Sequence, residues 1–417
     1  MLTRGERALL RARAHATLRA NWREGIDPTG REYAFTCPSP RRYKHQWYWD
    51  SCFHAIVWAR LEPARARAEL RTLLRAGRPD GFVPHTVFWH AHPRWRRAPL
   101  YATHAWRGDR ATAHTQTPLL AFAWERVARA SHDSRFATEA LDALLAHADW
   151  FERERDPDGD GLITIVLPDE SGLDDSPKYD PVFGRCAHWR PGYFALVERY
   201  RRRGWDSRTI IAEHESHVED VLVSVAHALS LRALARLMTG AGRTADAAHL
   251  ERRAARTERA LVERCWDERR GLFLDLAGRR ERPIDVSTWS ALSPLALGDA
   301  IPEAIRRRLV EEHLLDPRRY ATPFGIPSVA LEEPAFRPGF DRWRTWRGPA
   351  WVNAAWLLVP ALDELGYREA ADRIVTSLAR AAARHGFREY YDPRTGRGHG
   401  ATRFGWSTLV VDLLESR

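Results

Sequence analysis

The chain has 417 residues, of which 44% are hydrophobic and 29% charged, and its proline and glycine residues are scattered. These values are typical of a globular protein and exclude a disordered or fibrous chain. The net charge of +10 comes almost wholly from arginine, since Lys44 and Lys178 are the only lysines. We interpret most of this charge as solvated surface, with an anionic ligand or, less favoured, a nucleic acid as alternatives.

The first 20 residues predict an amphipathic helix and no signal peptide, because charges run through them without an apolar core segment. No window reaches the roughly 18 apolar residues of a membrane helix, so we predict a cytoplasmic protein with no membrane partner. The four cysteines lie far apart, which predicts free, buried thiols. They are Cys37, Cys52, Cys186 and Cys265.

Helices of two kinds alternate along the chain. Arginine-, glutamate- and alanine-rich amphipathic segments, expected to be half exposed, fall near 4–22, 63–77, 135–153, 242–265, 303–314 and 367–385. More apolar segments, expected to be buried on most sides, fall near 50–60, 110–130, 216–239, 286–297, 347–365 and 404–415. Six outer and six inner helices predict an all-α fold, an (α/α)6 barrel or toroid whose inner ring surrounds a pocket.

The connections before the inner helices are long and hold many of the Trp, His, Pro and Gly residues. They cover 31–49, 78–109, 154–192, 266–285, 315–346 and 386–403. Long loops in a compact domain usually serve function, and here they would all open at one end of the toroid. We predict one catalytic domain over residues 1–417, with a cap of loops and helices at about 154–215.

One of these loops, residues 169–177, has the sequence DESGLDDSP; we call it the acidic loop. Its four carboxylates, Asp169, Glu170, Asp174 and Asp175, cannot all ionise cheaply, so we expect at least one raised pKa, as a general acid requires. A solvated acidic turn is an equally open interpretation.

Upstream, residues 156–161 (DPDGDG) resemble the start of a calcium loop, but Leu167 stands where an EF-hand needs glutamate. We interpret this segment as a glycine-rich turn that leaves an opportunistic cation site open, and we predict no metal. No phosphate-binding glycine loop, GxSxG elbow or HExxH helix is present, which disfavours nucleotide chemistry, serine hydrolysis and zinc proteolysis. No cofactor is predicted.

A second candidate carboxylate, Glu389, lies among aromatic residues before a Pro/Gly turn, where a structural role is also open. The aromatic loop 43–51 (YKHQWYWDS) precedes the first inner helix. Aromatic faces beside a carboxylate suit a small-molecule carbohydrate, because sugar C–H faces pack on rings and Asp50 can accept hydroxyl hydrogen bonds. Asp50 can equally cap the helix. Similar clusters precede other inner helices, at 82–89, 114–118 and 343–351.

Eight segments, in the same order from about residue 43 to 407, resemble glycoside hydrolase family 63 and, within it, the bacterial mannosylglycerate and glucosylglycerate hydrolases. They are HQWYWDSCFHAI, DGFVPHTVFW, HTQTPLL, ESGLDDSP, HVEDVL, FGIPS, WRGPAWVNAAW and EYYDPRTGRG. The resemblance implies an (α/α)6 barrel and inverting hydrolysis of an α-glycosidic bond. It implies Asp174 as the general acid and Glu389 as the general base. The sugar-binding positions that it implies are Trp49, Asp50, Gln116, Trp346 and Trp351, and we add Trp47 and Arg347 from the same motifs.

The sequence departs from the family pattern at Thr345, where a tyrosine often stands, in the arginine-rich loop 90–110 and at 201–215. We expect a small α-linked glucoside or mannoside as substrate, with glucosylglycerate and mannosylglycerate as candidates. The basic residues Arg94, Arg96, Arg97, Arg107 and Arg110 either meet a carboxylate such as glycerate or are plain surface. An α-glucosidase acting on oligosaccharides, a non-catalytic sugar-binding toroid, and an isomerase or lyase using His85 or His114 remain alternatives.

Overall fold

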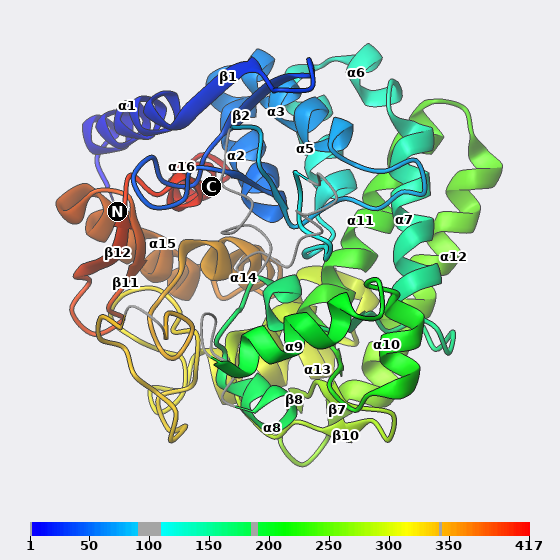
Figure 1. The fold of residues 1–417 in the computed structure, drawn as a ribbon. Helices are drawn as coiled ribbons and strands as arrows, with labels where there is room; N and C mark the ends of the chain where they lie inside the picture. Colours follow the sequence, from blue (N-terminus) through cyan, green and yellow to red (C-terminus); the bar gives the residue numbers. More distant parts are fainter. Residues whose placement is uncertain (1, 91–109, 185–190, 342–343) are drawn as a thin grey trace.

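The structure, a computed structural model, describes residues 2–90, 110–184, 191–341 and 344–417. Its helices form an inner and an outer set (Figure 1). The inner set comprises α2 (Tyr48–Leu61), α5 (Leu120–Ser131), α11 (Val221–Gly240), the 3-10 segment η5 (Trp289–Ala300), α14 (Val352–Glu364) and η7 with α16 (Gly405–Thr408, Leu409–Glu415). Each contacts the next in this order, and α16 contacts α2 again, so the inner set closes on itself.

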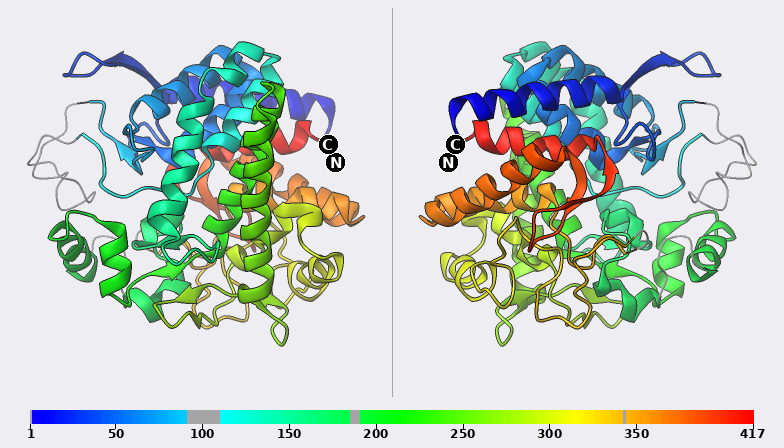
Figure 2. Two further views of the ribbon diagram at one scale, coloured as in Figure 1. Left: turned by 90° about the vertical axis from the view of Figure 1, so that its right-hand side faces the viewer. Right: turned by 90° about the vertical axis from the view of Figure 1, so that its left-hand side faces the viewer.

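The outer helices pack on this inner set. They are α1 (Arg4–Asn21), α3 (Pro63–Arg75), α6 (Ser134–Thr138), α7 (Leu141–Arg155), α12 (Thr244–Ala260) with the π turn η4 (Leu261–Cys265), α13 (Glu303–Arg308) with the π turn η6 (Leu309–Leu314), and α15 (Arg368–His385). In α1, a capping box of Thr3 and Glu6 begins the helix and Leu10, Ala14 and Leu18 bury one face. Figure 2 shows α7, α11 and α12 side by side, and the two termini close together.

The alternation of outer and inner helices is confirmed, but three inner helices begin later than predicted. The predicted helix 110–130 begins at Leu120, 216–239 at Val221, and 347–365 at Val352. Pro118 and Pro349 precede two of these starts, and a proline disfavours helical backbone in the residue before it. The prediction of an α-helix at 286–297 is wrong: this segment forms 3-10 turns, with Pro294 inside and Gly298 at φ 57°.

Short strands, which the sequence did not predict, lie mostly in the loops that precede the inner elements, so the all-α prediction is incomplete. Two-stranded antiparallel sheets pair β1 (Trp22–Ile26) with β2 (Glu32–Thr36), β3 (Gln46–Trp47) with β4 (Thr86–Val87), β7 (Trp266–Asp267) with β8 (Leu272–Phe273), and β11 (Arg388–Tyr391) with β12 (Gly398–Thr402). A four-stranded sheet has the order β10 (Arg282–Pro283), β9 (Leu276–Ala277), β6 (Val218–Glu219) and β5 (Thr164–Ile165).

The segment between α7 and α11 is the longest of the insertions. It contains β5, the 3-10 turns η2 (Pro168–Ser171) and η3 (Pro177–Tyr179), and the helices α8 (Asp180–Phe183), α9 (Pro191–Arg201) and α10 (Ser207–Glu213). Figure 1 shows α8, α9 and α10 gathered on one side of the molecule. The acidic loop runs through η2 and η3.

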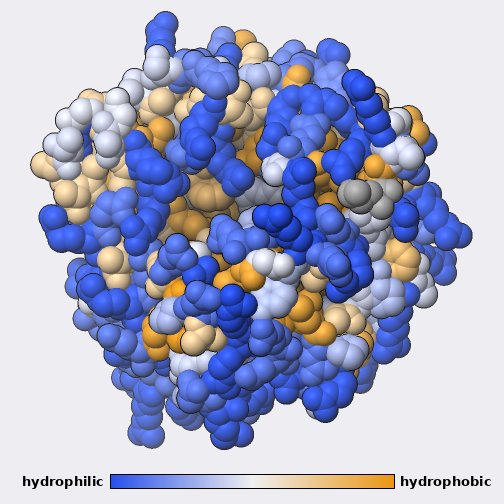
Figure 3. All heavy atoms as spheres, turned by 180° about the vertical axis from the view of Figure 1, so that it is seen from behind, coloured by the Kyte–Doolittle hydropathy of each residue, from blue (hydrophilic) through white to orange (hydrophobic). Residues whose placement is uncertain are grey.

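Helix α11 corrects the expectation that no segment suits a membrane. By length and composition alone, Val221–Gly240 is apolar enough to cross one, but 83% of its most apolar window is buried inside the protein. It is a core helix of this fold. Cys37, Cys52 and Cys265 are buried free thiols, as predicted, and Cys186 lies outside the described residues. The face shown in Figure 3 is mostly hydrophilic, which agrees with arginine as solvated surface.

Candidate active site

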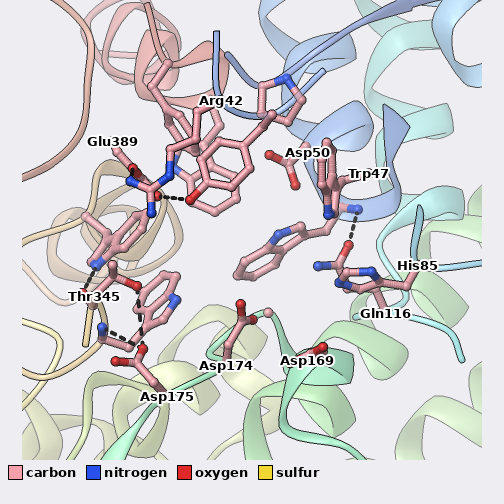
Figure 4. A pocket seen from close by; sticks show the side chains of 18 of the residues that line it. Arg42, Trp47, Asp50, His85, Gln116, Asp169, Asp174, Asp175, Thr345 and Glu389 are labelled. Atoms are coloured by element: carbon pink, nitrogen blue, oxygen red, sulfur yellow. Dashed lines mark hydrogen bonds and ion pairs between the residues drawn. The ribbon is translucent and has the colours of Figure 1, made fainter. Parts of the chain in front are cut away.

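A cavity of about 410 Å³ opens where the loops before α2, α5, α14 and α16 meet the acidic loop. We call it the aromatic cavity (Figure 4). Its lining residues are Pro38, Arg42, Tyr43, Trp47, Trp49, Asp50, His85, His114, Gln116, Asp169, Gly172, Asp174, Asp175, Thr345, Trp346, Trp351, Glu389, Phe404 and Trp406. Eight of the nine predicted site residues line this cavity, as expected if the long loops open at one end of the fold.

Tryptophan rings form the apolar wall of this cavity. Trp346 and Trp351 stack with ring centroids 4.0 Å apart and planes 8° apart, and the indole N–H of Trp351 donates to the carbonyl oxygen of Thr345 at 3.0 Å. Trp406 stands edge-on to Trp49, with centroids 5.1 Å apart. Because these rings brace one another, they give a rigid apolar surface of the kind on which sugar C–H faces pack.

Hydrogen bonds fix the polar side chains at the start of α2. The backbone N–H of Trp49 donates to Oε1 of Gln116 at 3.0 Å, so the amide N–H groups of Gln116 are the ones left to face a ligand. Asp50 is almost fully buried, and burial raises its pKa to about 7. At such a pKa the carboxyl exists in both protonation states near neutral pH and can donate or accept a hydrogen bond.

Glu389 lies on β11 and is only 3% exposed. Its carboxylate accepts hydrogen bonds from the hydroxyl of Tyr43 at 2.7 Å, the backbone N–H of Ala401 at 2.6 Å and the guanidinium of Arg42 at 3.3 Å. Burial, together with the charge of Glu389, raises the pKa of Tyr43 well above its usual value, so that Tyr43 keeps its proton and donates. Three donors from separate parts of the chain therefore fix the position of this carboxylate.

Backbone geometry aims Glu389 into the cavity. The register of β11 with β12 shifts between Arg388 and Tyr390, a bulge that re-aims the side chain between them. The partner strand has Gly400 opposite, at φ +66°, where an added Cβ would lie 2.4 Å from Oε2 of Glu389. Glycine is therefore required at position 400 for Glu389 to keep this position.

The acidic loop lies across the cavity from Glu389 (Figure 4). Asp174 is half-buried and lines the cavity together with Asp169 and Asp175. Gly172, at φ +74°, lets the loop pass against Trp49, because an added Cβ would lie 2.3 Å from its ring. Glu170 turns away from the cavity and forms a buried ion pair with Arg155.

The expected rise in pKa occurs in this loop, but its first cause is burial rather than crowding. Burial raises the pKa of Asp175 to about 7, and it also raises that of Glu170. Oδ1 of Asp175 accepts the backbone N–H of Trp346 at 3.1 Å, whereas its Oδ2 has no hydrogen-bond partner among the described residues. The raised pKa values therefore belong to Asp175 and Glu170, two neighbours of Asp174 in the acidic loop.

A buried lysine anchors the end of the acidic loop. Nζ of Lys178 donates to Asp220 at 2.8 Å, to Asp275 at 3.1 Å and to Ser290 at 3.1 Å. Burial alone would lower the pKa of Lys178, but the charges of Asp220 and Asp275 outweigh it and the pKa is raised. Lys178 therefore stays charged and ties the loop to β6, β9 and η5.

Arg347 differs in its position from the other predicted site residues. It does not line the cavity; its guanidinium makes two hydrogen bonds to Asp180, at 2.8 and 2.6 Å. In the arginine-rich loop 90–110, Arg110 donates to the carbonyl oxygens of Trp89 and His90. The arginines at 94, 96, 97 and 107, and likewise Trp343, lie outside the described residues.

The sequence analysis did not identify Arg42, a charged residue that lines the cavity and pairs with Glu389. The only signal for it was its position directly before the aromatic loop, since its partner Glu389 is 347 residues away. His85 and His114 do line the cavity and stack with centroids 4.7 Å apart, on the side of Gln116. Figure 4 shows His85 there, away from Glu389.

The profile of the mannosylglycerate hydrolase MGH1-like glycoside hydrolase domain matches residues 43–407. A mannosylglycerate hydrolase of Rubrobacter radiotolerans is 32% identical over 97% of this chain and 96% of its own. A glucosylglycerate hydrolase of Mycolicibacterium hassiacum is 29% identical over 90% of this chain and 93% of its own.

A crystal structure of the family 63 mannosylglycerate hydrolase from Thermus thermophilus, in complex with Tris and D-glycerate, superposes with a TM-score of 0.84. It is 29% identical and covers 98% of this chain and 100% of its own. The extent of these matches, from the aromatic loop to η7, shows that the chain belongs to the mannosylglycerate hydrolase MGH1-like group of glycoside hydrolase family 63 and is a glycoside hydrolase.

Proposed function

We propose that this glycoside hydrolase cleaves a small α-linked glycoside of glycerate with inversion, using Asp174 as general acid and Glu389 as general base. The observation that supports this most is the placement of the two carboxylates on opposite sides of one aromatic cavity (Figure 4). An inverting pair needs a gap of about 6.5–9.5 Å between carboxyl groups, because a water must fit between the base and the sugar.

The two environments suit the two roles. Glu389 is held in place by three hydrogen-bond donors, and in this proposal it takes a proton from the attacking water. Asp174 lies half-buried beside Asp175, a carboxyl that burial keeps protonated up to about pH 7, so a proton for the leaving oxygen is available on that side. Water that attacks from the Glu389 side, opposite the leaving group, inverts the anomeric centre.

The proposed fold is a single (α/α)6 barrel, with residues 154–215 as a cap beside the cavity. The closed cycle of contacts between inner helices supports this arrangement. In this proposal the sugar ring packs on Trp346, Trp351, Trp49 and Trp47, and its hydroxyls bond to Asp50 and Gln116, all of which line the cavity.

The glycerate leaving group is proposed from the relatives, which are named as mannosylglycerate and glucosylglycerate hydrolases. Arg42 supports it, because this cation lines the cavity beside Glu389, at 3.3 Å. A carboxylate in the substrate would find a positively charged side chain there.

Proton NMR of the first product anomer tests the reaction directly. Mannosylglycerate, glucosylglycerate and α-linked disaccharides are each incubated with the protein, and early spectra are recorded before mutarotation. We expect the β-anomer of the free sugar first, and a higher kcat/KM for the glycerate glycosides than for the disaccharides. An α-anomer first would reject inversion, and preference for the disaccharides would reject glycerate as the leaving group.

A further inference from the structure

Four carboxylates that do not line the aromatic cavity meet on another part of the molecule. Asp158, Asp160, Glu219 and Glu281 each place one oxygen so that all four oxygens lie within 4.8 Å of one another. They come from three places in the four-stranded sheet: the turn before β5, the strand β6 and the turn between β9 and β10. We call this group the carboxylate cluster.

Glu219 is the unusual member of the carboxylate cluster. It is only 7% exposed, and its buried Oε2 has no hydrogen-bond partner among the described residues. Because β6 is paired with Thr164 of β5 on one side and Leu276 of β9 on the other, the backbone cannot move this side chain out to solvent. A carboxylate buried without a partner is costly unless a proton or a cation neutralises it.

The positive charge beside the cluster does not balance it. Arg264 forms ion pairs with Asp160, at 2.9 Å, and with Glu281, and no other cation pairs with the cluster in the described residues. One guanidinium therefore faces four carboxyl groups.

The geometry points to a binding site for a divalent cation, with Ca²⁺ as the ion of best fit, formed by Asp158, Asp160, Glu219 and Glu281. Ca²⁺ takes oxygen ligands at about 2.3–2.6 Å, so two ligands of one ion lie at most about 5 Å apart. The oxygens of the cluster satisfy this limit without rearrangement. Mg²⁺, with ligands at about 2.0–2.1 Å in near-ideal octahedral geometry, sets a narrower limit on the separation of its ligands.

The exposure of the carboxylate cluster to water and the number of ligands that Ca²⁺ requires also agree with this site. Asp158 is exposed, and Asp160 and Glu281 are half-buried, so water can reach the ion and complete its shell of six to eight oxygens. This site differs from an EF-hand, because only Asp158 and Asp160 come from the DPDGDG turn. Asp156, at the start of that turn, instead pairs with Arg256 at 2.8 Å.

An ion here would reinforce the anchor of the acidic loop. Asp220, the residue after Glu219, accepts from Lys178, which directly follows that loop. A cation that ties β6 to the two neighbouring turns would therefore stabilise the folded protein, because it binds a site that the unfolded chain lacks.

The test uses protein stripped with EDTA and dialysed, titrated with CaCl₂ at pH 7 by isothermal calorimetry, with Tm measured in parallel. We expect about one Ca²⁺ per chain and a rise in Tm with Ca²⁺ concentration. Glu219→Gln should abolish both, and Asp160→Asn should weaken binding at least about tenfold. Glu263→Gln, at an exposed glutamate outside the cluster, should behave as wild type.

Absence of Ca²⁺ binding to the wild-type protein would overturn the proposal. So would binding that is equally tight in Glu219→Gln and Asp160→Asn, because the ion would then lie elsewhere. If Glu219→Gln fails to fold, the comparison of Asp160→Asn with Glu263→Gln decides. The measurement needs no substrate, so its result does not depend on the proposed hydrolase reaction.

Discussion

On one side of the aromatic cavity, Glu389 accepts from Tyr43, Ala401 and Arg42; on the other, Asp175 has one oxygen on the N–H of Trp346 and one without a partner among the described residues. Both carboxyls are almost fully buried. The two carboxyls therefore differ in their hydrogen-bond donors rather than in their burial. We name the two sides of the cavity after the proposed roles, a base side with Glu389 and an acid side with the acidic loop.

The largest effects should come from removing the two proposed catalytic groups. Glu389→Gln and Asp174→Asn should each lower kcat by about 10²–10⁴-fold. An aryl glycoside with an acidic leaving group needs no proton, so it should restore much of the activity of Asp174→Asn and none of that of Glu389→Gln. Steady-state kinetics on both substrates measure this, with Glu263→Gln as control. Equal rescue of the two variants would contradict the division into an acid side and a base side.

A smaller effect is expected from the backbone that aims the base. Gly400→Ala would place a Cβ 2.4 Å from Oε2 of Glu389, and a displacement of about 1 Å can lower kcat about 10²-fold. Gly386→Ala is the matched control, since Gly386 also has positive φ, at +75°, but an added Cβ meets no atom within 4 Å. Both variants carry the same kind of backbone strain. If they lose the same activity, contact with Glu389 is not the reason.

Removing a single donor tests the base side more finely. Tyr43→Phe deletes the 2.7 Å hydrogen bond to Glu389, and a bond to a charged group contributes about 1.5–3 kcal/mol. We expect kcat/KM to fall about tenfold, because 1.4 kcal/mol corresponds to a factor of about ten. Tyr320→Phe, at a buried tyrosine that bonds Ser287, is the control. Wild-type kcat/KM in Tyr43→Phe would show that the other donors suffice.

The acid side is tested by stability. The pKa of Asp175 is raised to about 7, so between about pH 4 and 7 the folded protein binds a proton that the unfolded chain has released, and this contribution to stability falls as pH rises. Asp175→Asn removes the dependence and keeps the acceptor for Trp346. The difference in Tm, variant minus wild type, should therefore increase from pH 5 to pH 8. Thermal melts at each pH measure this difference, and Asp299→Asn, at an exposed aspartate, is the control. A pH-independent difference would contradict the raised pKa.

The sequence predicted the order of the helices because most helices are long enough to repeat their apolar pattern over several turns. It could not predict β5 or β6, since a strand of two residues has no period, and it placed a helix at 110–119 and at 286–297 where Pro118 and Pro294 prevent one. Of these segments, 110–119 contributes His114 and Gln116 to the cavity, and β6 contributes Glu219 to the carboxylate cluster.

For the site, the resemblance to family 63 selected Asp174 and Glu389, whereas the spacing of carboxylates did not. The structure added Arg42 and Gly400, which act on Glu389 across the fold. It placed Arg347 on Asp180, 167 residues away along the chain, and not in the cavity lining. Contacts of this separation leave no pattern in one sequence.

The burial of Lys178 has a practical consequence for chemical labelling. The chain has two lysines, of which Lys44 is exposed and Lys178 fully buried. An acylating reagent should therefore modify the Lys44 side chain at once, and Lys178 only when the acidic loop detaches from Asp220 and Asp275. The rate at which Lys178 is acylated, followed by mass spectrometry, would therefore measure how often the cavity opens on the side of the acidic loop.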